Sequence, residues 1–320
     1  DKCENISIFT ISIFWQSFIN FLSNLDSHEY PYKNSKVLQI FLIKLKNIKN
    51  IKIVISGSFW YRFDIPIGNK FDEIGVPYTI IHKECFKYNV NQHKATIQRF
   101  RRNKCNASYY LLHNEVIKKV LMMDVPKEKI DVLGNIRMDE IFKNRETTGK
   151  DLSFFLFPQI IGLDDWVVDD IAKRKFKGGW KKLFRNTTKC ILKFAEENQE
   201  ININVKGKDN NEISYFKKIC DTLGYKNLDK IKNLKLSFNE NAQDIILRSK
   251  LIISFGSTVI LEAAVLGREI IIPNFDECSK SDYKKRIKLI NDYKLFIIAN
   301  TENQLYELIK KSFFRISCRK

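Results

Sequence analysis

The chain has 320 residues, of which 44% are hydrophobic and 29% charged, with only 12 glycines and 6 prolines. This composition excludes extensive disorder, and the length exceeds that of one ordinary hydrophobic core, so we expect two domains. The formal net charge of +18 favours anionic partners such as nucleotide phosphates, anionic lipids, acidic glycans or nucleic acid, but charge alone does not choose among them.

Cysteine and histidine are spread thinly along the chain, with no Cys-x-x-Cys pair and no zinc-like spacing. We therefore expect reduced thiols, a cytoplasmic protein and no metal or other cofactor. The chain begins at Asp1 rather than Met, so we expect some N-terminal sequence to be missing. Residues 6–22 carry no charge, but Gln16 and Asn20 interrupt the run, which favours a buried strand and helix over a membrane span.

Short apolar runs rich in β-branched residues alternate with helical segments along most of the chain. In the first half we predict a helix at 114–123 and strands at 51–57, 76–82, 107–113 and 129–135. The polar, turn-rich stretch 142–150 predicts a linker. Beyond it we predict strands at 152–157, 201–207, 234–238, 251–256, 269–275 and 295–300. Helices are predicted at 187–198, 212–223, 242–249, 258–266 and 301–314.

Strands that are apolar on both faces and separated by helices are typical of parallel sheets covered on both sides. The sequence therefore predicts an α/β protein of two Rossmann-like domains, residues 1–142 and 151–320, facing each other across a cleft. The cleft is the expected place for a ligand.

The most informative segment is the strand, turn and helix at 251–266. The predicted strand ends at Phe255, Gly256 permits a tight turn, and Ser257 and Thr258 begin a helix. Unpaired N–H groups and the helix dipole stabilise an anion at such a turn. Glu262 lies one turn into the helix, within reach of a ribose diol. An ordinary helix start with Ser as N-cap explains the same residues equally well.

The run FGSTVILEAAVLGREIIIP, residues 255–273, resembles the donor-binding segment of GT-B glycosyltransferases and their relatives. Those relatives include UDP-N-acetylglucosamine 2-epimerases and CDP-glycerol glycerophosphotransferases. The resemblance implies that Gly256, Ser257 and Thr258 hold the diphosphate of a nucleotide-activated donor and that Glu262 binds the ribose. The Asp that usually precedes the Ser is missing, because Phe255 and Gly256 stand there.

Residues 127–142, KEKIDVLGNIRMDEIF, resemble the "GNPRxD" segment that closes the N-terminal domain of bacterial surface carbohydrate biosynthesis proteins, with Ile136 in place of Pro. The resemblance implies that Asn135, Arg137 and Asp139 lie in the cleft. An Arg–Asp pair that merely fixes the linker is the alternative.

The run VKGKDN, residues 205–210, parallels a Lys-Pro-His or Lys-Gly segment of the same relatives. The resemblance implies that Lys206 and Lys208 lie near the donor phosphates, for which a flexible point charge is suited. Accidental placement on a lysine-rich surface is the alternative, especially for Lys208.

The predicted strand 76–82 ends at His82, and Glu84 follows. Reactive side chains of α/β proteins lie at the carboxyl ends of parallel strands, and transfer to a hydroxyl needs a base near neutral pH. His82 is therefore the first catalytic candidate and Glu84 the second. A solvated loop with an incidental histidine is the alternative. His113 also ends a strand and is a weaker candidate.

The stretch 173–185 holds seven basic side chains and no acid, with Phe176, Trp180 and Phe184 at every fourth position. This pattern suits an anionic membrane surface carrying lipid-linked acceptors. A segment whose aromatic rings pack on the domain is the alternative.

Together these features predict the transfer of a sugar or glycerol phosphate from a nucleotide-activated donor to a surface polysaccharide or lipid-linked acceptor. The reaction would occur in the cytoplasm or at the inner face of the membrane. A nucleotide-sugar 2-epimerase is the alternative, and Glu84, Asp139 and Glu262 are the carboxylates available for it. A nucleic-acid-binding protein is a third interpretation, but no RNA- or DNA-binding motif is present, so nucleic acid is not an expected partner.

Overall fold

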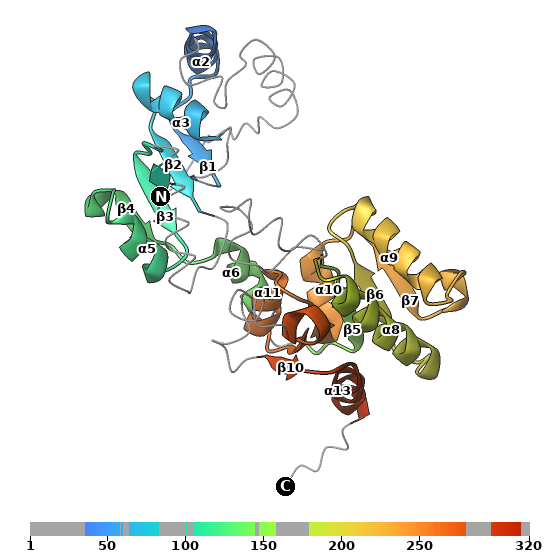
Figure 1. Ribbon diagram of the computed structural model, residues 1–320. Helices are drawn as coiled ribbons and strands as arrows, with labels where there is room; N and C mark the ends of the chain where they lie inside the picture. Colours follow the sequence, from blue (N-terminus) through green and yellow to red (C-terminus); the bar gives the residue numbers. More distant parts are fainter. Residues whose placement is uncertain are drawn as a thin grey trace. The chain divides into compact units, whose positions relative to one another are not determined.

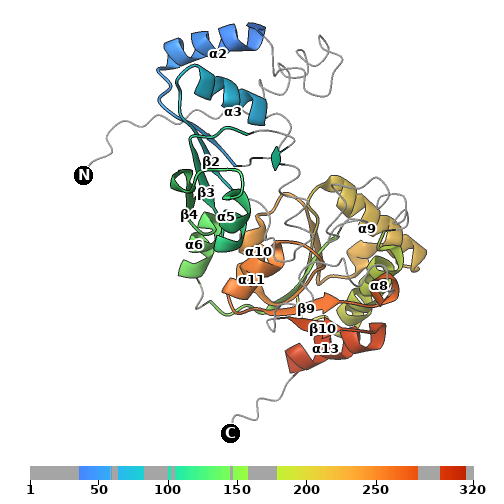
Figure 2. The ribbon, with the colours of Figure 1, turned by 60° about the vertical axis from the view of Figure 1, so that its left-hand side comes forward.

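The computed structural model describes residues 36–57, 59, 64–82, 100–101, 105–144, 147–157, 179–279 and 296–314. The chain divides into two compact units, Asp1–Asn135 and Ile136–Lys320. Each unit is built on its own parallel sheet with helices packed against it (Figures 1 and 2). The predicted fold class of two parallel-sheet α/β domains is therefore confirmed.

The first unit contains a sheet of order β1-β2-β3-β4 in which every neighbouring pair is parallel. Its strands are β1 (Val54–Ser56), β2 (Tyr78–Ile81), β3 (Tyr109–Leu112) and β4 (Ile130–Val132). Its helices are α2 (Lys36–Lys49), α3 (Asp64–Glu73), α5 (Glu115–Leu121) and the 3₁₀ turn η1 (Lys127–Lys129). All four strands fall within the runs predicted from the sequence.

Successive side chains of a strand point to opposite faces of the sheet, and this alternation places the large side chains of β2 and β3 in one core. Tyr78 and Ile80 of β2 and Tyr110 of β3 are buried with Ile117 and other side chains of α5. The start of α5 is fixed by a contact between near neighbours in sequence, because the Asn114 side chain accepts a hydrogen bond from the Ile117 amide at 2.9 Å. The carboxyl ends of β2 and β3 are thus held against a fixed helix.

The second unit contains a sheet of order β10-β9-β8-β5-β6-β7, again with every neighbouring pair parallel. Its strands are β5 (Asp151–Phe155), β6 (Ile203–Lys206), β7 (Leu234–Ser237), β8 (Ser249–Ile253), β9 (Glu269–Pro273) and β10 (Ile297–Ala299). Its helices are α6 (Ile136–Lys143), α8 (Lys181–Glu197), α9 (Asn210–Thr222), α10 (Ala242–Arg248), α11 (Val259–Val265) and α13 (Glu302–Phe314), with 3₁₀ turns η2 (Leu228–Lys230) and η3 (Asp276–Ser279).

The strand order of the second unit reverses next to β5. From β5 the chain moves outward through β6 to β7, then crosses to β8 on the other side and continues to β9 and β10. In open parallel sheets, ligands bind outside the carboxyl ends of the strands at such a switch point. The expected ligand position is therefore beyond β5 and β8, where the 254–258 turn begins.

The described residues of the predicted linker 142–150 are held by contacts within the second unit. Helix α6 extends to Lys143, and Arg268 donates to the carbonyl of Thr147 at 2.6 Å and to its hydroxyl at 2.9 Å. Gly149 lies so close to β8 that an added Cβ would come within 1.8 Å of the Ser249 carbonyl oxygen.

Gly149→Ala is therefore expected to lower the free energy of unfolding of the second unit by about 1–3 kcal/mol, the usual cost of forcing extra volume into a packed site. Urea denaturation would measure the loss, with Lys150→Ala, at an exposed neighbouring position, as the control. Equal unfolding midpoints for the two variants would contradict the close approach of Gly149 to β8.

Candidate functional site

The turn after β8 has the form predicted from the sequence. Phe255 is buried, Gly256 adopts a left-handed φ of 65°, and Thr258 is the exposed N-cap of α11. A left-handed φ is accessible to glycine at little cost, which explains Gly256 at this point. The turn thus places a half-buried Ser257 and an exposed Thr258 at the carboxyl edge of the sheet.

The backbone N–H groups of Gly256, Ser257 and Thr258 have no hydrogen-bond acceptor among the described residues. The Thr258 side chain does not cap the helix, and the Ser257 hydroxyl makes only a long contact of 3.4 Å with the Val259 amide. Successive amides that point outward from such a turn form a concave anion site.

Three other helices of the second unit have side-chain acceptors for amides of their first turn. Asp209 accepts from the Glu212 amide at the start of α9, and Thr301 accepts from the Gln304 amide at the start of α13. Helix α8 is capped from a distance, because Glu277 accepts from two of its first amides at 2.8 Å each. The first amides of α11 also have acceptors, namely the Ser257 hydroxyl and the carbonyl oxygens of Ser257 and Thr258, so the amides available for a ligand belong to the turn before the helix.

A cluster of buried aromatic rings packs against Phe255, at the start of the turn. The ring of Phe255 packs on Trp180 and on Phe157, with centroid separations of 4.9 Å and 5.5 Å. The sequence did not reveal this cluster, because its members are far apart along the chain. It explains why the turn begins with an aromatic residue at position 255.

The same cluster removes two of the three aromatic rings from the predicted membrane-facing stripe of residues 173–185. Trp180 is fully buried and Phe184 is 3% exposed, so these two rings belong to the core of the second unit and are not available to a bilayer. Phe176 lies outside the described residues. Within the part of the chain that the structure describes, no helix is long and apolar enough to cross a membrane.

Lys206 ends β6 at the same edge of the sheet. Its side chain is buried, and its ammonium donates to the carbonyl oxygens of Gly207 and, at 2.8 Å, of Phe238. Burial lowers the pKa of Lys206, while the carboxylates of Glu212 and Glu240 act in the opposite direction. The alternative of an accidental surface lysine is wrong for Lys206.

Lys208 differs from Lys206 in being exposed. Its backbone amide donates to the Glu212 carboxylate at 2.7 Å, which fixes the start of α9, and its side chain projects at the surface. A role for the Lys208 ammonium in donor binding stays a prediction.

Glu262 lies in the first turn of α11 but is 5% exposed. Its predicted contact with a ribose stays a prediction.

The segment after β4 supplies the other predicted cleft residues. Asn135 is half-buried directly before α6, and Asp139 is exposed in the first turn of that helix. The side chain of Arg137 lies outside the description, so the predicted Arg–Asp pair is not tested.

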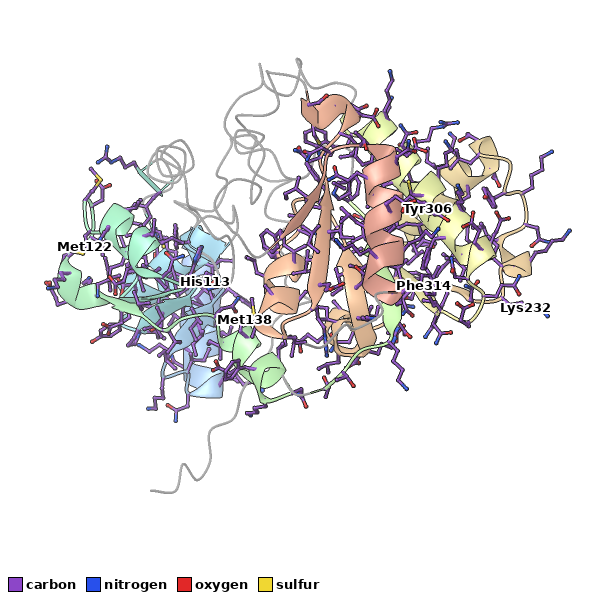
Figure 3. The ribbon with its side chains drawn as sticks, turned by 90° about the horizontal axis from the view of Figure 1, so that it is seen from below. His113, Met122, Met138, Lys232, Tyr306 and Phe314 are labelled. Atoms are coloured by element: carbon purple, nitrogen blue, oxygen red, sulfur yellow. The ribbon has the colours of Figure 1, made fainter. Side chains whose placement is uncertain are left out.

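His82 and His113 follow the neighbouring strands β2 and β3 and lie together in the first unit (Figure 3 labels His113). Their exposures are 2% and 7%, and their ring centroids are 5.2 Å apart in an edge-to-face arrangement. His82 also stacks on Phe59 at 4.5 Å. The alternative of a solvated loop is therefore wrong for His82, whereas Glu84 lies outside the described residues.

The partnership of His113 with His82 could have been suspected from the sequence, because both residues directly end predicted strands. Among the described residues no group of three His, Cys, Asp or Glu side chains is placed to hold a metal ion.

Comparison with known proteins places this geometry in a structural context. The sequence matches no protein-family model and no curated protein significantly. Solved structures with a similar fold include the UDP-GlcNAc 2-epimerase of Methanocaldococcus jannaschii, with 13% identity, a TM-score of 0.52, and coverage of 87% of this chain and 75% of that one. Another is a Listeria monocytogenes protein assigned provisionally as a UDP-N-acetylglucosamine 2-epimerase, with 10% identity, a TM-score of 0.51, and coverage of 86% and 69%. This chain thus shares the fold of these proteins over most of its length.

Proposed function

We propose that this chain is an enzyme acting on a nucleotide-activated sugar, and that the turn at 256–258 binds the diphosphate. The observation that carries the proposal is the row of amides of Gly256, Ser257 and Thr258, which have no acceptor among the described residues and belong to residues that are half-buried or exposed. They stand beside the switch point of a parallel sheet, and α11 adds the positive end of its dipole. Fixed donors of this kind stabilise a diphosphate without a metal ion.

Lys206 complements the turn electrostatically. It stands two strands away from β8 in the sheet order, which at ordinary strand spacing is about 10 Å. That separation exceeds the size of a diphosphate, so Lys206 would meet a different part of the same ligand.

For the reaction we favour 2-epimerisation of a nucleotide sugar over transfer. The support is the likeness of fold to two structures described as UDP-N-acetylglucosamine 2-epimerases. Transfer to a glycan or lipid-linked acceptor is the competing proposal, and the buried His82 at a strand end is the group that supports it, as a base for an acceptor hydroxyl.

One assay separates the two reactions. The protein is incubated with UDP-N-acetylglucosamine in D₂O without any acceptor, and the sugar is followed by proton NMR. Epimerisation removes the hydrogen at C2 and returns one to the opposite face, so we expect a second sugar with the inverted configuration and deuterium at C2. Turnover that requires an added glycan or lipid-linked acceptor would instead establish a transferase. Failure of UDP, CDP and GDP sugars alike to bind would contradict the proposed nucleotide site.

A further inference from the structure

The position of the Lys206 ammonium depends on the segment that follows β7. Of its three donor hydrogens, two are used by the carbonyl oxygens of Gly207 and Phe238, which leaves one for a ligand. The amide of Gly207 in turn donates to the carbonyl of Ser237 at 2.9 Å. The ends of β6 and β7 are thus tied to each other, and any shift of Phe238 would move the ammonium.

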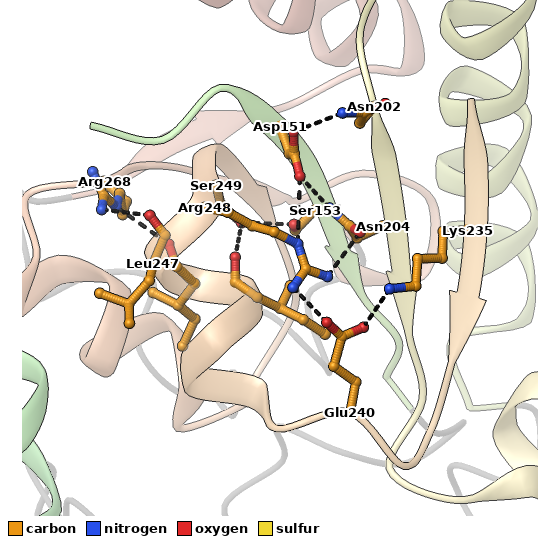
Figure 4. A network of polar contacts seen from close by, with 12 residues as sticks. Asp151, Ser153, Asn202, Asn204, Lys235, Glu240, Leu247, Arg248, Ser249 and Arg268 are labelled. Atoms are coloured by element: carbon orange, nitrogen blue, oxygen red, sulfur yellow. Dashed lines mark hydrogen bonds and ion pairs between the residues drawn. The ribbon is translucent and has the colours of Figure 1, made fainter. Parts of the chain in front are cut away.

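A network of ion pairs and hydrogen bonds also fixes the segment after β7 (Figure 4). Glu240 forms an ion pair with Arg248 at 2.5 Å and a second with Lys235 at 3.1 Å. Arg248 also donates to Asn204 at 2.9 Å and lies 3.4 Å from the carboxylate of Asp151. The guanidinium therefore joins the start of β5, the middle of β6 and the loop after β7.

The contacts of Arg248 require a guanidinium. Each of its three nitrogens faces a different partner, namely Asp151, Glu240 and Asn204. A lysine keeps the charge but has a single nitrogen and cannot span three partners in one plane.

We propose that Arg248 is a positioning residue for Lys206. By holding Glu240, it holds the carbonyl oxygen of Phe238 in the place where that oxygen orients the ammonium toward an anionic ligand at the carboxyl edge of the sheet. This role rests on the proposed function, because it assigns Lys206 to a bound nucleotide. It deepens that function by naming the internal group that keeps the lysine in its binding position.

The test is a double-mutant cycle read out as the affinity for UDP. Arg248→Lys is expected to weaken binding about tenfold, the usual size of coupling within one network. Lys206→Ala is expected to weaken it at least as much, and adding Arg248→Lys to Lys206→Ala should cause no further loss. Glu240→Gln keeps the size of the side chain and removes its charge, so it tests the ion pair between Glu240 and Arg248 through the other partner.

Arg268→Lys is the matched control. Arg268 also binds backbone oxygens at the end of α10, those of Ile246 and Leu247, but it contacts neither Glu240 nor Phe238. We expect its replacement to leave UDP affinity within about twofold of the original. If the loss of UDP affinity in the double variant equalled the product of the two single losses, Arg248 and Lys206 would act independently, and the proposal would be overturned.

A second measurement does not depend on the nucleotide. Lysine acetylation by acetic anhydride, followed by mass spectrometry, reports how firmly each ammonium is held. Lys206 should react several-fold faster in Arg248→Lys than in the original protein or in Arg268→Lys. If the protein binds no UDP, the proposed nucleotide site fails, and unchanged labelling of Lys206 would then separately overturn its positioning by Arg248.

Discussion

Replacing Thr258 by proline is expected to weaken nucleotide binding by about 10- to 150-fold, while Thr258→Ala leaves most of the affinity in place. Proline removes the amide hydrogen itself, and a hydrogen bond to a charged group contributes about 1.5–3 kcal/mol. The backbone φ of Thr258 is −65°, the value that proline imposes, so the exchange preserves the path of the chain at this residue. Proline is also well tolerated at the start of a helix.

Thr258→Ala is the control because it deletes the hydroxyl and keeps the amide. The side chain makes no capping bond to α11, so both variants should unfold at nearly the same urea concentration as the original protein. Isothermal titration with UDP measures the affinities. Equal binding by the two variants would show that this amide does not contact the ligand, and a large loss for the alanine variant would transfer the role to the hydroxyl.

The turn at 256–258 was predictable because its signals are local. A buried strand, a glycine and two hydroxyl residues follow one another directly, and each element constrains the next. The strands β5, β8 and β9 were predictable for a related reason, since they are buried on both faces and read as continuous apolar runs.

Helix α8 shows where local reasoning stops. The sequence predicted a helix from 187, whereas α8 begins at Lys181, soon after a pair of glycines. The early start is stabilised by Glu277, whose carboxylate accepts from the amides of Lys182 and Leu183 at 2.8 Å each. These partners are more than ninety positions apart in the chain, so no window of sequence contains the contact.

Helix α3 was not predicted for a similar reason. Its sequence contains Pro66 and Gly68, which favour turns when considered alone. In the structure a Cβ at Gly68 would lie 2.0 Å from the ring of Tyr78, so the glycine serves close packing of the helix on β2. The network around Arg248 was likewise hidden, because Asp151 and Asn204 lie on strands remote from it in sequence.

Phe255→Ala is expected to lower the free energy of unfolding of the second unit by about 3–5 kcal/mol, the range for deleting a buried phenylalanine ring. Phe255 is fully buried, and its ring contacts Trp180 and Phe157. Phe314→Ala removes the same ring from a position that is 49% exposed and should cost about 1 kcal/mol or less. Urea denaturation of both variants measures the difference.

Phe255→Asp asks whether a charged side chain could stand at this position. Here the carboxylate would enter a site enclosed by Trp180 and Phe157, where neither ring can pair with it, and an uncompensated buried charge costs several kcal/mol. We therefore expect Phe255→Asp to be less stable than Phe255→Ala. If Phe255→Asp were as stable as the original protein, the rings would not be what supports the turn.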